Sequence, residues 1–223
     1  MPADPVTFTV HIVDDDPDVL RSTEVLLHAA GYRAKTYPSA TALLDNLASL
    51  SPGCVVTDVR MPDIDGLDLL ARLAAARPDL PVIVMTGHGD VPMAVRAMRA
   101  GAKDFIEKPF ANEVLLAAVD HALNRAERRR TEQAVLDDIA ARVRRLTPRE
   151  REVMVLIADG QTSKEIARAL GLSPRTVEMH RAMVLAKMQV PNTTALVRMV
   201  LATERAAGQP GAVTKDVGGS PRY

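Results

Sequence analysis

The chain has 223 residues, 47% apolar and 25% charged, a composition that suits a globular protein with one domain of about 120 residues and a smaller second one. No run of about 18 apolar residues occurs, and the N-terminal MPADPVTF lacks the basic and apolar parts of a signal sequence, so we expect no membrane span. Cys54 is the single cysteine, which excludes a disulfide within the chain and favours a small apolar core residue in a reducing cytoplasm.

The formal net charge of zero conceals an asymmetry along the chain. Residues 1–124 contain 17 acidic and 10 basic residues, which leaves 11 acidic and 18 basic residues, of 28 of each kind, for residues 125–223. A basic half favours binding to a polyanion. Attraction between two oppositely charged halves is the alternative reading of the same numbers.

Apolar runs alternate with helical patterns five times in the first half of the chain. Strands are predicted within HIVDDD (11–16), near Arg33–Tyr37, and within CVVTD (54–58), PVIVMT (81–86) and DFIEK (104–108). Helices are predicted at 17–31, from Ser39 to about Leu50, at 66–77, at 91–101 and from Asn112 onward. This alternation predicts a doubly wound α/β domain of the flavodoxin-like type over residues 1–124.

The second half of the chain reads as helical throughout. Residues 125–144 contain no Gly or Pro and predict a helical linker that continues the preceding helix. Capping boxes at Thr147 and Thr162, and Ser173 followed by Pro174, predict the starts of three helices, and a fourth is predicted at about 193–205. Residues 145–206 therefore predict a four-helix domain with a helix-turn-helix, and the Gly-rich residues 207–223 predict a disordered tail.

Polar side chains stand at the carboxyl ends of four predicted strands. They are three carboxylates, a hydroxyl and an ammonium, from Asp14, Asp15, Asp58, Thr86 and Lys108. In parallel sheets the strand ends meet at one edge, so we expect a single site. Each residue alone is equally well explained as a helix cap or a surface residue, but their ordered placement favours Mg²⁺ and a phosphoryl group, with Asp58 as the nucleophile.

The motifs VDDD, TDVRMPDIDGLDLL and VIVMTGHGDVPMAVRAMRAGAKDFIEKPF resemble the receiver domain of bacterial two-component response regulators, over about residues 6–124. The segment 81–110 is especially similar to the FixJ branch. The resemblance implies that Asp58 is the phosphoacceptor. It also implies that Asp15, Asp14 through water, Asp58 and the carbonyl of Arg60 bind Mg²⁺.

The same resemblance implies which residues bind the phosphoryl group and which residues respond to it. Thr86 and Lys108 would bind the phosphoryl oxygens, and the Lys108–Pro109 peptide would be cis. Thr86 would move toward the phosphoryl group and leave space for Phe105, the aromatic switch residue. The surface of the fourth helix, fifth strand and fifth helix would then dimerise, with interface residues Val91, Val95 and Lys103, although Val95 would equally suit the core.

The segment LTPREREVMVLIADGQTSKEIARALGLSPRTVEMHRAMVLAKM is similar to the LuxR/FixJ four-helix DNA-binding domain, over about residues 145–205. On that resemblance, Thr176, Glu178, Met179 and Ala182 would face the major groove, and Arg175, His180, Arg181 and Lys187 would hold phosphates. Lys164 and Arg168 add to the basic cluster. Glu178 would suit either a cytosine amine or plain solvent.

These features predict a phosphorylation-activated transcription factor rather than an enzyme with an external substrate. Its expected partners are a sensor histidine kinase, double-stranded DNA with a two-fold operator, a second copy of the chain and RNA polymerase. Resemblance to the FixJ branch suggests activation of nitrogen-fixation or microaerobic genes.

Two other functions remain open. A regulator that binds DNA without phosphorylation would share the second domain. A Mg²⁺-dependent phosphotransferase with an aspartyl nucleophile is disfavoured, because haloacid-dehalogenase-like enzymes place an acid two residues after the nucleophile, where this chain has Arg60.

Overall fold

The computed structural model describes residues 8–87 and 91–206, so the tail prediction for residues 207–223 lies outside the described residues. The chain divides into two compact units, the first ending at Thr131 and the second beginning at Glu132. Each unit is described by itself below. Within the described ranges, no helix is both long and apolar enough to cross a membrane.

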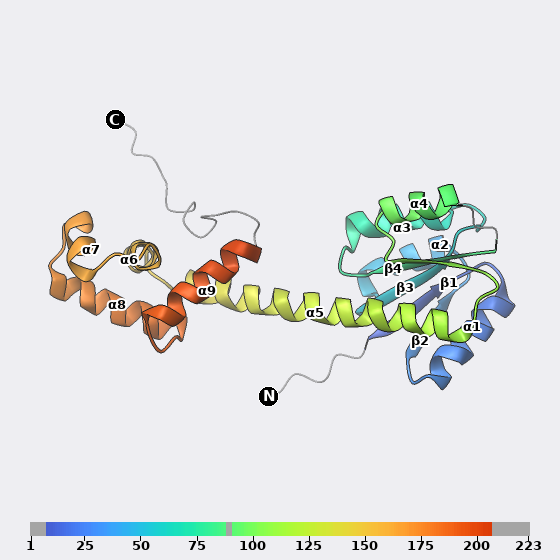
Figure 1. Cartoon of the computed structure of the whole chain (residues 1–223), viewed down its shortest axis with the longest axis horizontal. Helices are drawn as coiled ribbons and strands as arrows, with labels where there is room; N and C mark the ends of the chain where they lie inside the picture. Colours follow the sequence, from blue (N-terminus) through green and yellow to red (C-terminus); the bar gives the residue numbers. More distant parts are fainter. Residues whose placement is uncertain (1–7, 88–90, 207–223) are drawn as a thin grey trace. The chain divides into compact units, whose positions relative to one another are not determined.

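A parallel sheet forms the centre of the first unit (Figure 1). Its strands are β1 (Thr9–Val13), β2 (Arg33–Tyr37), β3 (Gly53–Asp58), β4 (Val82–Thr86) and β5 (Asp104–Glu107). They are ordered β2-β1-β3-β4-β5, and all neighbouring pairs are parallel. This is the flavodoxin-like order, which confirms the predicted fold class.

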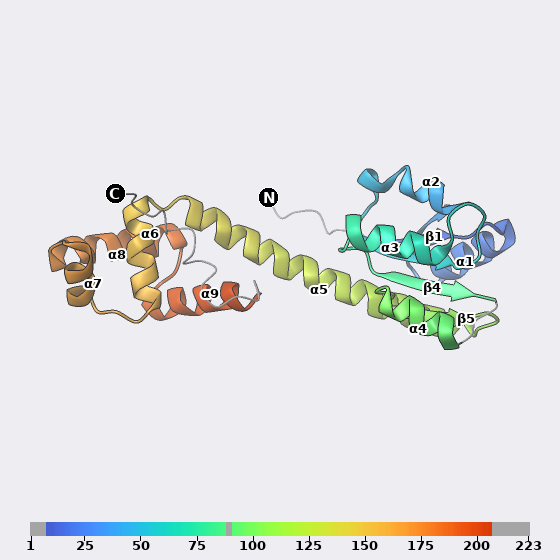
Figure 2. The same ribbon diagram turned by 90° about the horizontal axis from the view of Figure 1, so that it is seen from above.

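Helices cover both faces of this sheet (Figures 1 and 2). They are α1 (Pro17–Ala29), α2 (Ala40–Leu44), α3 (Gly66–Ala76), α4 (Val91–Arg99) and α5 (Asn112–Arg144). Residues of α2, α3 and α4 share one apolar core with the sheet, and residues of α1 and α5 share the other. Coverage on both faces explains why β3 and β4 are buried at every position and lack an alternating pattern.

The predicted helix from Ser39 to about Leu50 is wrong in its extent. Ser39 does cap a helix, but α2 ends at Leu44, and a 3₁₀ turn, η1, follows at Leu47–Ser49. The side-chain amide of Asn46 donates to the carbonyl of Ala42, and the backbone N–H of Asn46 donates to Leu43. Such local bonds offer the backbone an alternative to continued α-helix.

Cys54 lies on β3 with no exposed surface. Burial raises the pKa of its thiol to about 12, so the thiolate is disfavoured at neutral pH. Cys54 therefore packs as a small apolar residue, as predicted.

The second unit is helical around its own core. It contains the end of α5 and the helices α6 (Pro148–Ala158), α7 (Ser163–Leu170), α8 (Pro174–Met188) and α9 (Thr193–Ala206). Both predicted capping boxes are present, at Thr147 and at Thr162. Gly171 ends α7 with a φ of 65°, a left-handed conformation that favours glycine. Helices α7 and α8 pack against each other across this turn and form the helix-turn-helix.

Candidate functional site

Three of the predicted site residues meet at the carboxyl ends of β1, β3 and β5. Asp58 is the last residue of β3, and Asp14 directly follows β1. The ammonium of Lys108 lies 2.8 Å from Asp14 Oδ2 and 2.8 Å from Asp58 Oδ1. Both carboxylates are buried, with 2% and 7% of the residue exposed. The arrangement is a cation held between two converging carboxylates.

Backbone hydrogen bonds fix these side chains in place. The N–H of Arg60 donates to Asp58 Oδ2 at 2.6 Å, and the N–H of Asp16 donates to Asp14 Oδ1 at 3.0 Å. The N–H of Lys108 donates to the carbonyl of Thr86 at 2.7 Å, which holds the ends of β4 and β5 together. Thr86 is fully buried, and the Lys108–Pro109 peptide is cis, as expected from the resemblance.

Burial and charge have opposite effects on the pKa values of Asp14 and Lys108. Burial raises the pKa of Asp14, and the nearby Asp58 adds to that rise, while hydrogen bonding to Lys108 opposes it. Burial acts to lower the pKa of Lys108, but hydrogen bonds to Asp14 and Asp58 outweigh it and raise that pKa above its usual range. Lys108 therefore remains an ammonium and partly neutralises the two carboxylates.

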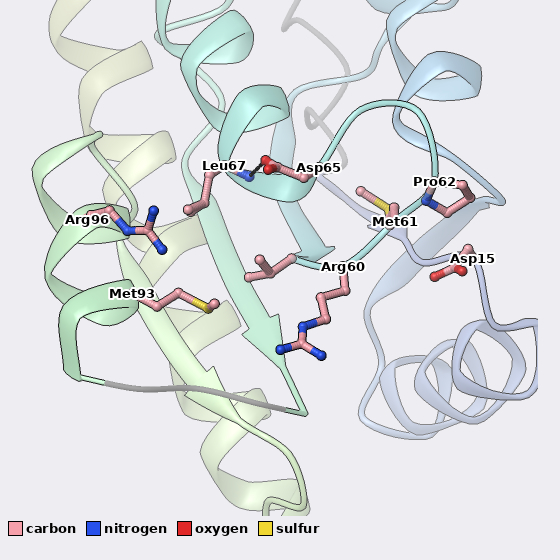
Figure 3. A pocket seen from close by; sticks show the side chains of 9 residues that line it. Asp15, Arg60, Met61, Pro62, Asp65, Leu67, Met93 and Arg96 are labelled. Carbon is pink, nitrogen blue, oxygen red and sulfur yellow. Dashed lines mark hydrogen bonds between the residues drawn. The ribbon is translucent and has the colours of Figure 1, made fainter.

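A pocket of about 510 Å³ opens beyond the end of β3, where Val59 and Arg60, the residues that follow Asp58, line it (Figure 3). Asp15 and Arg60, both predicted site residues, line it together with Asp65. On the other side Met93 and Arg96 of α4 project toward the same space. These two residues were not predicted, because no local motif marks them and only the packing of α4 brings them to the pocket. An incoming group would meet carboxylates and guanidinium groups at once.

The oxygen ligands here suit Mg²⁺. Two carboxylates converge on one point at Lys108, and Asp15 lines the adjoining pocket. Within residues 8–87 and 91–206, no group of three or more His, Cys, Asp or Glu side chains is arranged to hold a metal by itself. Mg²⁺ needs no such cage, because it keeps several waters and takes one or two carboxylates plus phosphate oxygens.

Two of the predicted dimer-interface residues are exposed on α4. Val91 and Val95 have 78% and 43% of their surface exposed, and Met98, which was not predicted, has 50%. Lys103 is half-buried before β5, and Phe105 on β5 is half-buried against the core shared with α4. The structure therefore leaves an apolar face exposed on α4, while Phe105 packs against the core that α4 shares with the sheet.

The predicted DNA-contacting residues fall on α7 and α8. The exposed ones are Lys164 on α7 and Arg175, Glu178, Met179 and Ala182 on α8, while Thr176, His180, Arg181 and Lys187 are half-buried. The buried side of α8 consists of Val177, Val184 and Met188, each with no exposed surface. Helix α8 thus presents one side to the core and leaves the predicted groove-facing side free of core contacts.

Three of these residues have partners within the unit that sequence reasoning missed. Lys187 Nζ lies 2.6 Å from Glu150 Oε2, and Arg181 donates to the Thr193 hydroxyl at 3.1 Å. The Ser163 hydroxyl donates to the carboxylate of Glu178. These contacts join residues 12 to 37 positions apart, so no local pattern signals them. Lys187 in particular has a structural role in addition to its proposed contact with phosphate.

Replacing Glu150 with Gln is expected to destabilise the chain by about 2 kcal/mol at neutral pH, because it removes a charged hydrogen-bond acceptor. Glu150 is 5% exposed and accepts from Lys187 and from the Thr147 N–H. The Lys187 hydrogen bond, with the Thr147 bonds, lowers the pKa of Glu150 against the opposing effect of burial. The stabilisation is therefore complete above the ordinary carboxyl pKa of about 4.3 and is lost as the pH falls through the lower folded value.

Urea unfolding of wild type and Glu150→Gln at about pH 7 and about pH 3 measures this difference. Glu152→Gln is the matched control, because Glu152 pairs with Arg149 but its side chain is 37% exposed, and it should lose at most about 1 kcal/mol. An unchanged gap between wild type and Glu150→Gln at the two pH values would contradict the assignment.

The fold and these surfaces define a class of protein: a receiver domain joined to a helix-turn-helix DNA-binding domain. Residues 10–120 match the response regulator receiver domain family, and residues 144–200 match the luxR family of bacterial regulatory proteins. The transcriptional regulatory protein FixJ of Bradyrhizobium diazoefficiens is 47% identical over 86% of this chain and 94% of its own length. The chain belongs to the FixJ-like response regulators, a family of transcription factors and not of metabolic enzymes.

Two further similarities support this assignment. The response regulator protein TmoT of Ectopseudomonas mendocina is 40% identical over 88% of each chain. A solved structure of the response regulator StyR is 36% identical, covers 87% of this chain and 98% of its own, and has a TM-score of 0.80. The two domain types imply a histidine kinase and DNA as partners.

Proposed function

We propose that Asp58 accepts a phosphoryl group from a histidine kinase and that this modification turns on dimerisation and operator binding. The observation that carries the proposal is the convergence of Asp14, Asp58 and Lys108 at the strand ends. Asp15 and Arg60, which lie next to Asp14 and two residues after Asp58, line an open pocket. Because these partners are a kinase domain and genomic DNA, we propose that the protein acts in the cytoplasm.

The transfer is a substitution at phosphorus. An oxygen of the Asp58 carboxylate forms the new bond, and the bond from phosphorus to the donor's histidine nitrogen breaks. Arg60 already donates its N–H to Asp58 Oδ2, which leaves Oδ1 to attack once Lys108 shifts its contact to a phosphoryl oxygen. A Mg²⁺ ion held by Asp14, Asp15, Asp58 and the Arg60 carbonyl would neutralise charge on the transferring group.

The negative charge of the bound phosphoryl group then changes the structure around Asp58. The phosphoryl group adds about −1.5 to −2 charges where Asp14 is already buried and carries a raised pKa. Lys108 and Thr86 are the nearby groups suited to bind its oxygens, and movement of Thr86 makes room for the half-buried Phe105. This shift favours one of two states of the α4 surface. The exposed Val91 and Val95 then pair with a second copy.

Dimerisation presents two copies of α8 to a two-fold DNA site. Exposed cations of Lys164, Arg168 and Arg175 supply phosphate contacts, and Arg181 joins them from a half-buried position. Recruitment of RNA polymerase and activation of transcription complete the proposed function. The FixJ relatives motivate, as a further proposal, control of nitrogen-fixation or microaerobic genes.

Mapping of the phosphoryl group tests this proposal. The full chain is incubated with Mg²⁺ and acetyl phosphate, and the acyl phosphate is trapped by borohydride reduction and located by peptide mass. Wild type should carry the reduced residue at position 58, and Asp58→Asn should carry none. Asp63→Asn, at an exposed acid with a φ of 70° that Asn also tolerates, should behave as wild type. A label elsewhere would remove Asp58 from its proposed role.

A further inference from the structure

Helix α8 has a second apolar face on the side opposite its core contacts. Four apolar residues, Met179, Ala182, Met183 and Ala186, follow the spacing i, i+3, i+4 and i+7 and are all exposed. At 100° per residue they lie on the side of the helix opposite Val177, Val184 and Met188, which are buried. We name these four residues the methionine stripe.

The two large side chains of the stripe are exposed to solvent. Met179 and Met183 have 57% and 46% of their surface exposed. A helix that packs only on the core needs one apolar face, and polar residues would serve on the other. Exposed apolar stripes of this kind mark interaction surfaces. We therefore expect the methionine stripe to contact an apolar group of a partner.

The surroundings of the stripe indicate which partner it meets. Arg175 is exposed one turn before Met179 on the same side of α8, and the exposed Lys164 and Arg168 lie on the adjoining helix α7. The stripe thus adjoins Arg175, one of the cations that we assign to DNA phosphates, on the same helix. A protein partner would be met by a rim of positive charge, whereas the edges of the DNA major groove are lined by phosphates.

The major groove offers one apolar group, the C5 methyl of thymine. Methionine is unbranched and adapts its shape to such a group, and alanine lets the helix backbone approach the bases closely. We propose that the methionine stripe reads thymine methyl groups in the operator, with Met179 and Met183 as the specificity-determining contacts. This inference rests on the proposed DNA binding and adds to it the kind of base that α8 selects.

Replacement of thymine by uracil in the DNA tests the contact, because it removes the methyl group alone. The phosphorylated full chain first selects double-stranded sites from a random pool. Each thymine of a selected half-site is then replaced singly by uracil. Affinity is measured for wild type, Met179→Ala, Met183→Ala and Leu201→Ala. Leu201 is the matched control, since it is an apolar residue of α9 with the same 46% exposure as Met183.

Loss of one buried methyl contact changes affinity roughly fourfold. Wild type and Leu201→Ala should each bind at least one uracil site that much more weakly than the thymine site. Met179→Ala or Met183→Ala should bind that thymine site and its uracil form equally. Because each protein is compared with itself on two DNAs, partial unfolding of a variant cancels from the ratio.

Two results would overturn the inference. In the first, wild type binds each thymine site and its uracil form with equal affinity, or both methionine variants lose as much affinity on uracil substitution as wild type does. In the second, the methionine variants change self-association without DNA, which would assign the stripe to a second copy. If wild type selects no DNA sequence at all, the proposed DNA binding itself fails, and that outcome is distinct from a selected site without methyl dependence.

Discussion

Replacing Lys108 with Met is expected to slow phosphorylation by acetyl phosphate about 10²-fold, which is the loss seen when one preorganised donor to a developing charge is removed. Lys108 contacts Asp14 Oδ2 and Asp58 Oδ1 at 2.8 Å each, so it is the cation nearest to the proposed acceptor oxygen. Methionine keeps an unbranched side chain, one heavy atom shorter than that of lysine, and removes its charge. Phosphoryl incorporation followed over time gives the rate.

The same change should also weaken the fold in a way that depends on Mg²⁺. Removing one partner of a buried ion pair costs about 3–5 kcal/mol, and the 21% exposure of the Lys108 side chain places this case near or below the lower end. Two buried carboxylates would then face each other without a cation. Added Mg²⁺ should therefore recover more stability in Lys108→Met than in wild type.

Lys103→Met is the matched control for both measurements. Lys103 is also half-buried in the first unit, but no ion pair with a described carboxylate involves it, and burial, with the nearby Arg125 and Arg129, lowers its pKa. Its replacement should leave the phosphorylation rate and the Mg²⁺ response near wild type. Equal rates in wild type and Lys108→Met would remove Lys108 from the site.

Replacing Gly66 with Ala should destabilise the first unit by about 3 kcal/mol, at the upper end of the usual range for overpacking. A Cβ at this position would lie 2.0 Å from the carbonyl oxygen of Asp58 and 2.9 Å from its carbonyl carbon. The neighbour is backbone and not a flexible side chain, so the strand end or α3 must move. Better helix propensity of Ala, worth up to about 1 kcal/mol, does not offset this clash.

The movement also reaches the proposed chemistry, because the displaced backbone belongs to Asp58. A shift of about 1 Å in a reacting group lowers the rate by about 10²-fold. Gly87→Ala is the matched control for stability, since a Cβ added at Gly87 would meet no described heavy atom within 4 Å. Denaturant unfolding and phosphoryl incorporation measure the two effects. A Gly66→Ala protein as stable and as reactive as wild type would contradict the close packing of α3 on Asp58.

Local signals in the sequence were sufficient for much of the fold. The doubly wound α/β architecture follows from alternation of strands and helices, and the helix starts at Thr147 and Thr162 follow from capping boxes that need only four residues. Asp14, Asp58 and Lys108 could be brought together because strand ends share one edge of a parallel sheet. Each of these inferences depends on periodicity, capping or topology, which are readable from a single chain.

The features that could not be predicted depend on packing between distant segments. Met93 and Arg96 reach the pocket only through the placement of α4, and Lys187 meets Glu150 across 37 residues. Met183 was not predicted to be exposed, although Met179 and Ala182 on the same side of α8 were expected to face the groove. The end of α2 was missed because side-chain bonds of Asn46 compete with the helix.

The central claim is that phosphorylation of Asp58 controls association with DNA, and one coupled measurement tests it. Wild type and Asp58→Ala are each incubated with Mg²⁺, with and without acetyl phosphate, and their mass in solution and their selection of DNA sites are measured together. We predict that wild type dimerises and selects a two-fold site after phosphorylation, and that Asp58→Ala does neither. If both proteins dimerise and bind the same DNA whether or not acetyl phosphate is present, the chain is a phosphorylation-independent DNA-binding regulator and the proposed switch is wrong.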